Sequence, residues 1–194
     1  MRRLVLYMTQ TLDGYLAGPD DELDWMTFPP ADEQVGDVVD LLNAADIRLM
    51  GYPTARGMVE YWDRVEETAD SPKWQRDIAE AFNPMHTIAV SKQEEDLTVR
   101  DSELLLARDD DELTRAVEEL KSRPGKDIVL IGGVRSGQTF ARLGLVDEYA
   151  LMVHPTAIGE GKRLFTHRTP LELVSAKAYT NGVVQLRYRR RAKG

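Results

Sequence analysis

The hydrophobic positions of the chain follow two repeating patterns, one typical of strands and one typical of helices. Short runs rich in Leu, Ile and Val are expected where a strand is buried on both faces of a sheet. In longer segments apolar residues recur every three or four positions, which predicts helices with one buried face. The predicted strands are residues 3–9, 47–50, 86–91, 128–131, 146–153, 171–179 and 183–188. The predicted helices are residues 32–45, 54–62, 72–82, 109–121 and 136–143.

The order of these elements indicates the fold class. Strands and helices alternate as far as residue 143, which predicts a three-layer α/β/α fold with a mixed, mostly parallel central sheet. The last strands follow one another directly, and Asn181-Gly182 favours an antiparallel hairpin because both residues tolerate positive φ. We find no repeat, low-complexity tract or linker, so residues 1–194 are expected to form a single domain.

Composition and charge exclude several classes of protein. Apolar residues make up 42% and charged residues 30% of the chain, which favours a globular core over disorder. The net charge of −8 is spread along the chain and argues against a nucleic-acid surface. Apolar runs are too short for a membrane helix, and the start lacks a secretory signal pattern. Because the chain has no cysteine, disulfides and thiolate chemistry are excluded. We expect a cytoplasmic protein without nucleic-acid or membrane partners.

Gly132-Gly133, between a predicted strand and a predicted helix, is the most informative local pattern. Glycine lets the backbone turn sharply and approach a ligand, and the free N–H groups at a helix start attract an anion. The arrangement suits a pyrophosphate, although a plain connecting turn explains the same pattern equally well. The spacing matches neither a Rossmann fingerprint nor a P-loop.

A second turn of this kind lies at residues 51–54. Gly51 ends a predicted strand, and the hydroxyl of Thr54 together with the helix start can hold a further phosphate oxygen. Taken alone, a simple N-cap role for Thr54 is the stronger interpretation. Two such turns in one α/β sheet support each other, because ligands bind beyond the carboxyl ends of the strands.

Metal, hydrolase and nucleic-acid sites are not predicted. The three histidines, His86, His154 and His167, are scattered and lie near no carboxylate cluster, so each is expected to be structural or solvated. No serine stands in a nucleophile elbow. The basic residues 187–191 are typical of a solvated strand end.

Several segments carry a family resemblance through their order and spacing. They are residues 11–17, 46–54, 87–91, 132–133 and 144–148, followed by Pro155 with residues 159–165. Over nearly its whole length the chain resembles the dihydrofolate-reductase-like superfamily. Within it, the chain is similar to the branch that contains the C-terminal reductase domain of the bifunctional riboflavin-biosynthesis enzyme.

The resemblance implies an NADPH-dependent reductase that transfers a hydride to a pyrimidine-type heterocycle, similar to 5-amino-6-(5-phosphoribosylamino)uracil reductase. A dihydrofolate or pterin reductase, or a nucleotide-binding protein without turnover, are the alternatives. The resemblance also implies a cis peptide between Gly132 and Gly133. Related domains often pair as homodimers, and Leu164-Phe165 can supply either an apolar interface or part of the protein's own core.

The resemblance further assigns roles to individual residues. The cofactor-binding residues it implies are Leu16, Ala17, Gly51, Thr54, Ser91, Lys92, Ile131, Gly132, Gly133, Val134, Arg135, Ser136 and Gln138. Asp13 and Trp25 are expected to face the substrate. If a proton is needed, either Asp32 or Asp37 on the first helix, or a bound water, is its expected source.

One departure from the family pattern affects the cofactor. Tyr52 stands where family members often carry an arginine that grips the 2′-phosphate of NADPH. NADH therefore remains open as an alternative, unless Lys92 or Arg56 replaces that arginine.

Overall fold

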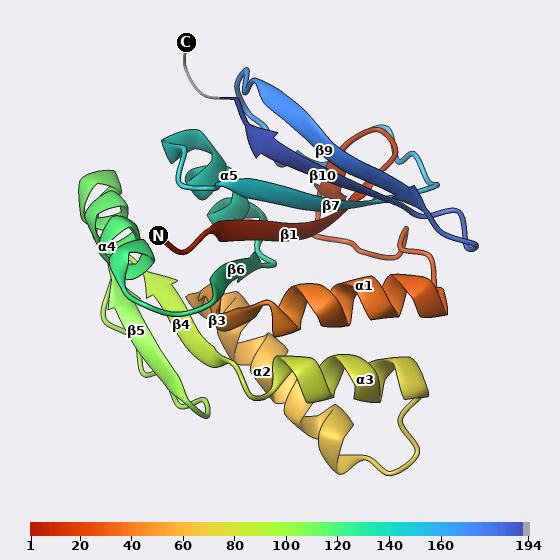
Figure 1. Ribbon diagram of the computed structural model, residues 1–194, viewed down its shortest axis with the longest axis horizontal. Helices are drawn as coiled ribbons and strands as arrows, with labels where there is room; N and C mark the ends of the chain where they lie inside the picture. Colours follow the sequence, from red (N-terminus) through yellow and green to blue (C-terminus); the bar gives the residue numbers. More distant parts are fainter. Residues whose placement is uncertain (192–194) are drawn as a thin grey trace.

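The computed structural model describes residues 1–191, and its centre is a sheet of eight strands (Figure 1). These strands are β1 (Leu4–Thr11), β3 (Ala45–Gly51), β4 (His86–Ser91), β5 (Ser102–Leu106), β6 (Asp127–Ile131), β7 (Glu148–His154), β9 (Leu171–Ala178) and β10 (Val184–Arg190). Their order across the sheet is β5-β4-β3-β6-β1-β7-β10-β9. Two short strands, β2 (Tyr15–Ala17) and β8 (Lys162–Arg163), pair with each other beside the sheet.

The strand directions confirm the predicted mixed sheet. All neighbours from β5 to β7 are parallel. In this sheet β10 is the one strand of reversed direction, and it pairs antiparallel with both β7 and β9. The hairpin between β9 and β10 turns at Asn181-Gly182, where Gly182 has a φ of 86°.

Helices cover both faces of the sheet, which confirms the three-layer architecture. The helices are α1 (Asp32–Asn43), α2 (Tyr52–Glu67), α3 (Lys73–Phe82), α4 (Asp110–Ser122) and α5 (Val134–Leu143). Figure 1 shows α1, α2 and α3 on one side of the sheet and α4 and α5 on the other. Successive residues of a strand point to opposite faces. Thus Leu130 packs in the core under α4 and α5, whereas Val129 and Ile131 pack in the core under α1 to α3.

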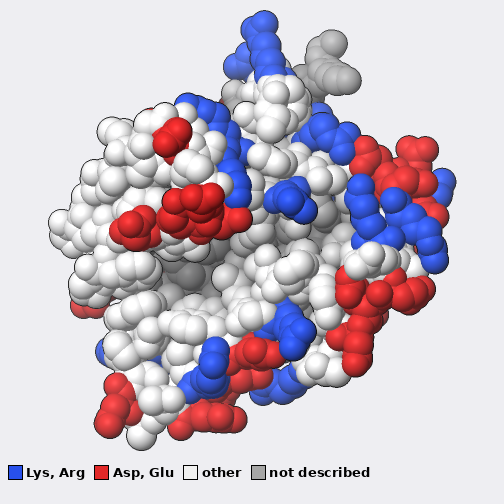
Figure 2. Space-filling model, turned by 180° about the vertical axis from the view of Figure 1, so that it is seen from behind, with Lys and Arg blue, Asp and Glu red and all other residues white. Residues whose placement is uncertain are grey.

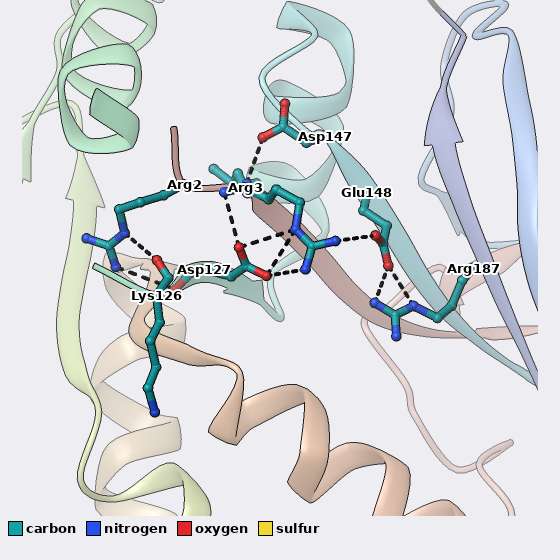
Figure 3. A network of polar contacts seen from close by, with 8 residues as sticks. Arg2, Arg3, Lys126, Asp127, Asp147, Glu148 and Arg187 are labelled. Carbon is teal, nitrogen blue, oxygen red and sulfur yellow. Dashed lines mark hydrogen bonds and ion pairs between the residues drawn. The ribbon is translucent and has the colours of Figure 1, made fainter. Parts of the chain in front are cut away.

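Ion pairs connect four strands of the sheet, β6, β1, β7 and β10, near the amino-terminal ends of the parallel strands (Figure 3). The guanidinium of Arg3, just before β1, bonds Asp127 of β6 at 3.1 Å and Glu148 of β7 at 3.2 Å. Arg187 of β10 donates from Nε to the other oxygen of Glu148 at 2.6 Å. Because Glu148 is 7% exposed, this carboxylate needs both arginines to remain buried.

Some expectations about local structure were wrong. The strands β2, β5 and β8 were not predicted, because they are short and lie beside or at the edge of the sheet. Thr54 is not a helix cap: α2 begins at Tyr52 after Gly51, so Thr54 lies in its first turn. Within residues 1–191 the cis peptide is Phe28–Pro29, so the implied cis bond between Gly132 and Gly133 is absent. Of the two roles left open for Leu164-Phe165, the structure supports the second for Leu164, which is 1% exposed and packs in the protein's own core.

Candidate functional site

A cavity of about 520 Å³ opens at the carboxyl ends of β1, β6 and β7, on the side of the sheet covered by α1, α2 and α3. Its wall is mostly apolar and includes Val35, Val38, Met58, Trp62, Ile78 and Ile131. In Figure 2 a hollow bordered mainly by uncharged residues lies in the left half of the view. A concave apolar site at the ends of parallel strands is the usual place for a ligand in an α/β fold.

The two predicted glycine turns meet beside this cavity. They follow β3 and β6, which are neighbours in the sheet. A Cβ atom at Gly51 would lie 2.5 Å from the Ser136 hydroxyl, and one at Gly133 would lie 3.0 Å from the Thr54 hydroxyl. A Cβ atom at Gly132 would lie 2.9 Å from the Thr54 methyl group. Each turn therefore packs against a side chain of the other, and both require glycine.

Both helix starts at this point lack a side-chain cap. Gly51 is the N-cap of α2 and Gly133 is the N-cap of α5, so neither residue can satisfy the first amide groups of its helix. In α5 the first backbone bond runs from the N–H of Gly137 to the carbonyl of Gly133 at 3.0 Å. The N–H groups of residues 134–136 are then free to bind an anion, with the helix dipole favouring it. These donors fit a diphosphate group.

Some of the predicted cofactor residues belong to the cavity wall, and others lie outside it. The cavity wall contains Leu16, Ala17, Ile131, Gly132, Gly133 and Val134. The side chain of Arg135 is exposed at the start of α5, and Lys92 is exposed after β4, the strand next to β3. Ser91 accepts the N–H of Gln93 at 3.2 Å. Gln138 lies further along α5, where its amide donates to the carbonyl of Arg163 at 2.7 Å.

Asp13 and Trp25, the expected substrate residues, lie outside the cavity wall. Asp13 accepts the hydroxyl of Thr11 and the backbone N–H groups of Ile158 and Gly159, at 2.6, 3.1 and 2.8 Å. The pKa of Asp13 is lowered, chiefly by the hydrogen bond from Thr11. Trp25 is 6% exposed and packs edge-on against His154, with ring centres 5.5 Å apart.

The two candidate proton donors also lie off the cavity wall. Asp37 accepts Lys177 Nζ at 2.5 Å and the hydroxyl of Tyr179 at 2.7 Å. Burial raises the pKa of Asp37, but these two bonds outweigh it and the net pKa is lowered. The structure thus holds Asp37 as a carboxylate, which is unfavourable for a general acid. Asp32 is exposed in the first turn of α1, facing a separate groove toward α3.

Sequence reasoning missed two polar residues of the cavity wall, Gln34 and His154. Gln34 is 6% exposed, and its carbonyl accepts the side-chain amide of Asn181 at 2.9 Å. His154 is 3% exposed and is the last residue of β7. Its place at the carboxyl end of a parallel strand next to β1 is the signal that would have identified it.

Comparisons with known proteins identify a family and a relative that matches over almost the whole chain. A family model described as the RibD C-terminal domain matches residues 2–185. The uncharacterized protein YyaP of Bacillus subtilis (strain 168) is 32% identical over 190 residues, covering 96% of this chain and 94% of that protein.

Solved structures agree on the fold. The deaminase/5-amino-6-(5-phosphoribosylamino)uracil reductase of Thermotoga maritima is 16% identical with a TM-score of 0.67, covering 98% of this chain and 57% of that one. Dihydrofolate reductase from Enterococcus faecalis, solved with NADP(H), is 11% identical with a TM-score of 0.61, covering 97% and 96%. At these identities the likeness concerns the fold alone.

Proposed function

The chain belongs to the RibD C-terminal domain family, and on that premise we propose that it is an NADPH-dependent reductase acting on a pyrimidine-type heterocycle. The observation that carries this proposal is the meeting of two uncapped helix starts, after Gly51 and Gly133, beside an apolar cavity. A dinucleotide needs both features, because its diphosphate is anionic and its nicotinamide ring is flat and largely apolar.

The residues of each feature suggest how the cofactor is held. The amides of residues 134–136 and the hydroxyls of Thr54 and Ser136 would bind the diphosphate. Leu16, Ala17 and Ile131, on the cavity wall, would border the nicotinamide. When bound, a reduced nicotinamide supplies the hydride. The chain orients the acceptor ring against it and keeps water out, which the apolar wall favours.

The preference for NADPH rests on the free cations near the glycine turns. Arg135 and Lys92 are exposed and form no ion pair among residues 1–191. Tyr52, at the position of the family arginine, instead donates its hydroxyl to the carbonyl of Asp96 at 3.1 Å. Either free cation can bind the 2′-phosphate, which NADH lacks.

Ligand-dependent melting tests the cofactor. NADPH at a hundredfold excess over its Kd should stabilise the chain by about 2.7 kcal/mol, and NADH should stabilise it less. Loss of reduced-nicotinamide absorbance with pyrimidine and pterin substrates then tests turnover. Turnover of pterins alone would favour the alternative reductase, and binding without any turnover would favour a nucleotide-binding protein. An unchanged Tm with both nucleotides would refute the proposal.

A further inference from the structure

His154 has one ring nitrogen that the fold does not satisfy. Its side chain is 3% exposed and forms part of the cavity wall. Nδ1 accepts the backbone N–H of Thr27 at 2.9 Å. Nε2 is buried and has no hydrogen-bond partner among residues 1–191. Buried polar atoms in folded proteins are nearly always paired, so an unpaired one at a cavity calls for a partner from outside the chain.

The bond to Thr27 fixes which nitrogen carries the proton. A backbone N–H can only donate, so Nδ1 must present its lone pair and the neutral ring carries hydrogen on Nε2. Burial lowers the pKa of His154, which keeps the ring neutral at pH 7. Trp25 packs against the imidazole at an interplanar angle of 80° and helps to hold its orientation. His154, a residue of the cavity wall, therefore carries an oriented N–H donor that has no acceptor among residues 1–191.

The charges on the cavity wall limit what that acceptor can be. Among the described residues of the wall there is no Lys or Arg, and Asp21 is the one carboxylate. Asp21 is exposed at the rim, where it pairs with Lys162 at 2.6 Å. Away from the amides of residues 134–136, a phosphate inside this cavity would lose water without gaining a cation. A carbonyl oxygen of a ligand could accept the N–H of His154. The side-chain carbonyl of Gln34 already accepts a hydrogen bond from Asn181, so the NH₂ group of Gln34 is left as a second donor.

We propose that the Nε2–H of His154 donates a hydrogen bond to a carbonyl oxygen of an uncharged ring, so that the cavity accepts the ring without a phosphoribosyl group. The inference deepens the proposed function and rests on it for the reaction. The ring contact is separable from the diphosphate, because His154 is the last residue of β7 whereas the glycine turns follow β3 and β6.

Nitrogen NMR of the full chain labelled with ¹⁵N-histidine tests the contact directly. Uracil is the probe for an uncharged ring with carbonyl oxygens, and uridine 5′-monophosphate is the same ring with a ribosyl phosphate. Titrations are run with and without NADP⁺. We expect uracil to move the Nε2 resonance of His154 and to bind at least as tightly as the nucleotide. The proposal would be overturned if the Nε2 resonance did not move, which is expected if Trp25 alone faces this nitrogen. It would also be overturned if the phosphorylated probe bound more tightly than uracil.

Two substitutions separate the donor from the structural role of the ring. His154→Asn keeps an acceptor for Thr27 but has no donor at the Nε2 position, whereas His154→Gln has an N–H donor near it. We expect uracil affinity to fall about tenfold in His154→Asn and to recover in His154→Gln, as for one hydrogen bond. His167→Asn, at an exposed site, is the matched control.

The cofactor readout keeps the two proposals apart. The NADPH-dependent rise in Tm should be the same in all three variants. If no variant and no wild-type protein binds NADPH while uracil still moves His154, the proposed function fails and the contact stands. If NADPH binds and the Asn and wild-type proteins bind uracil equally, the contact fails.

Discussion

Thr54 and Gly133 are in contact across the two strand–helix turns: a Cβ atom at Gly133 would lie 3.0 Å from the Thr54 hydroxyl. Gly133 also has a φ of 74°, a left-handed conformation that side chains rarely adopt. Residue 133 must therefore be glycine for two reasons, its positive φ and the close approach of Thr54, at the place where the proposed diphosphate would bind.

Substitution of Gly133 by alanine should weaken both stability and nucleotide binding. The positive φ costs an alanine about 1–2 kcal/mol, and the added methyl group displaces Thr54. Urea unfolding and the NADPH-dependent change in Tm measure the two effects. Gly57→Ala is the control, because nothing lies within 4 Å of a Cβ atom at that helical position and alanine favours helix by about 1 kcal/mol over glycine. Equal nucleotide binding by both variants would contradict the diphosphate site.

Tyr52→Arg should increase the preference for NADPH over NADH. An arginine here would add a charge-assisted contact to the 2′-phosphate, worth about 1.5–3 kcal/mol or roughly tenfold or more in relative Kd. Tyr52→Phe removes only the hydroxyl bond to the carbonyl of Asp96, so it controls for that bond. Isothermal titration with both nucleotides gives the ratio, and an unchanged ratio in Tyr52→Arg would place the 2′-phosphate elsewhere.

Asp37 should make the protein sensitive to acid. Its pKa is lower in the folded chain than in the unfolded chain, so its contribution to the free energy of unfolding is complete above the unfolded pKa of about 3.9 and is lost as the pH falls below it. Asp37→Asn should cost on the order of 1 kcal/mol at pH 7 and flatten the acid limb of the stability curve. Asp40→Asn, on the exposed side of α1, is the control.

Asp37→Asn, together with Asp32→Asn, also tests the predicted proton donors. The role of Asp32 or Asp37 as proton donor stays a prediction. Because neither residue belongs to the cavity wall, we expect Asp32→Asn and Asp37→Asn to retain hydride transfer. Steady-state kinetics with the substrate found by the turnover screen measures this. A large loss of kcat in one variant that remains folded would restore that carboxylate as the acid.

Glu148→Ala should be strongly destabilising because it leaves Arg3 and Arg187 without their shared buried partner (Figure 3). We expect a loss of about 1–3 kcal/mol in the free energy of unfolding. Glu172→Ala removes an exposed pair with Arg189 in the same sheet and should cost much less, because solvent screens an exposed pair. Similar losses in both variants would show that burial adds nothing to the Glu148 network.

We also propose that two copies of the chain associate through β9. This edge strand exposes Leu173 and Val174 by 55% and 50%, and an exposed edge strand with apolar residues tends to pair with another strand. Val174→Lys should then shift the protein to a smaller species in light scattering. A monomeric wild-type protein would refute the proposal.

The sequence predicted the parts of the molecule that depend on local pattern. Buried strands such as residues 128–131 show unbroken apolar runs, and the helices over residues 32–43 and 110–122 show a clear apolar stripe. The strand over residues 102–106 escaped because it pairs on one side only and follows a polar loop. Both glycine turns were found because glycine at a strand end is visible without knowledge of the fold.

The rest of the site depends on contacts between distant segments. His154 looks like an isolated histidine until Thr27 is placed against it, 127 residues away in the chain. Asp37 looks like a helix carboxylate available for catalysis until β9 and the turn after it bring Lys177 and Tyr179 to it. In both cases the chemistry of the side chain is set by a partner that no local pattern reveals.

The last hairpin is bonded to the start of α1 by three successive residues. Tyr179, Thr180 and Asn181 bond Asp37, Glu33 and Gln34. Gln34 belongs to the cavity wall, so residues 179–181 support a site whose wall begins far earlier in the sequence, at β1 and α1. A chain truncated before residue 179 would keep both glycine turns but would lose the anchor that holds Gln34 in the cavity wall.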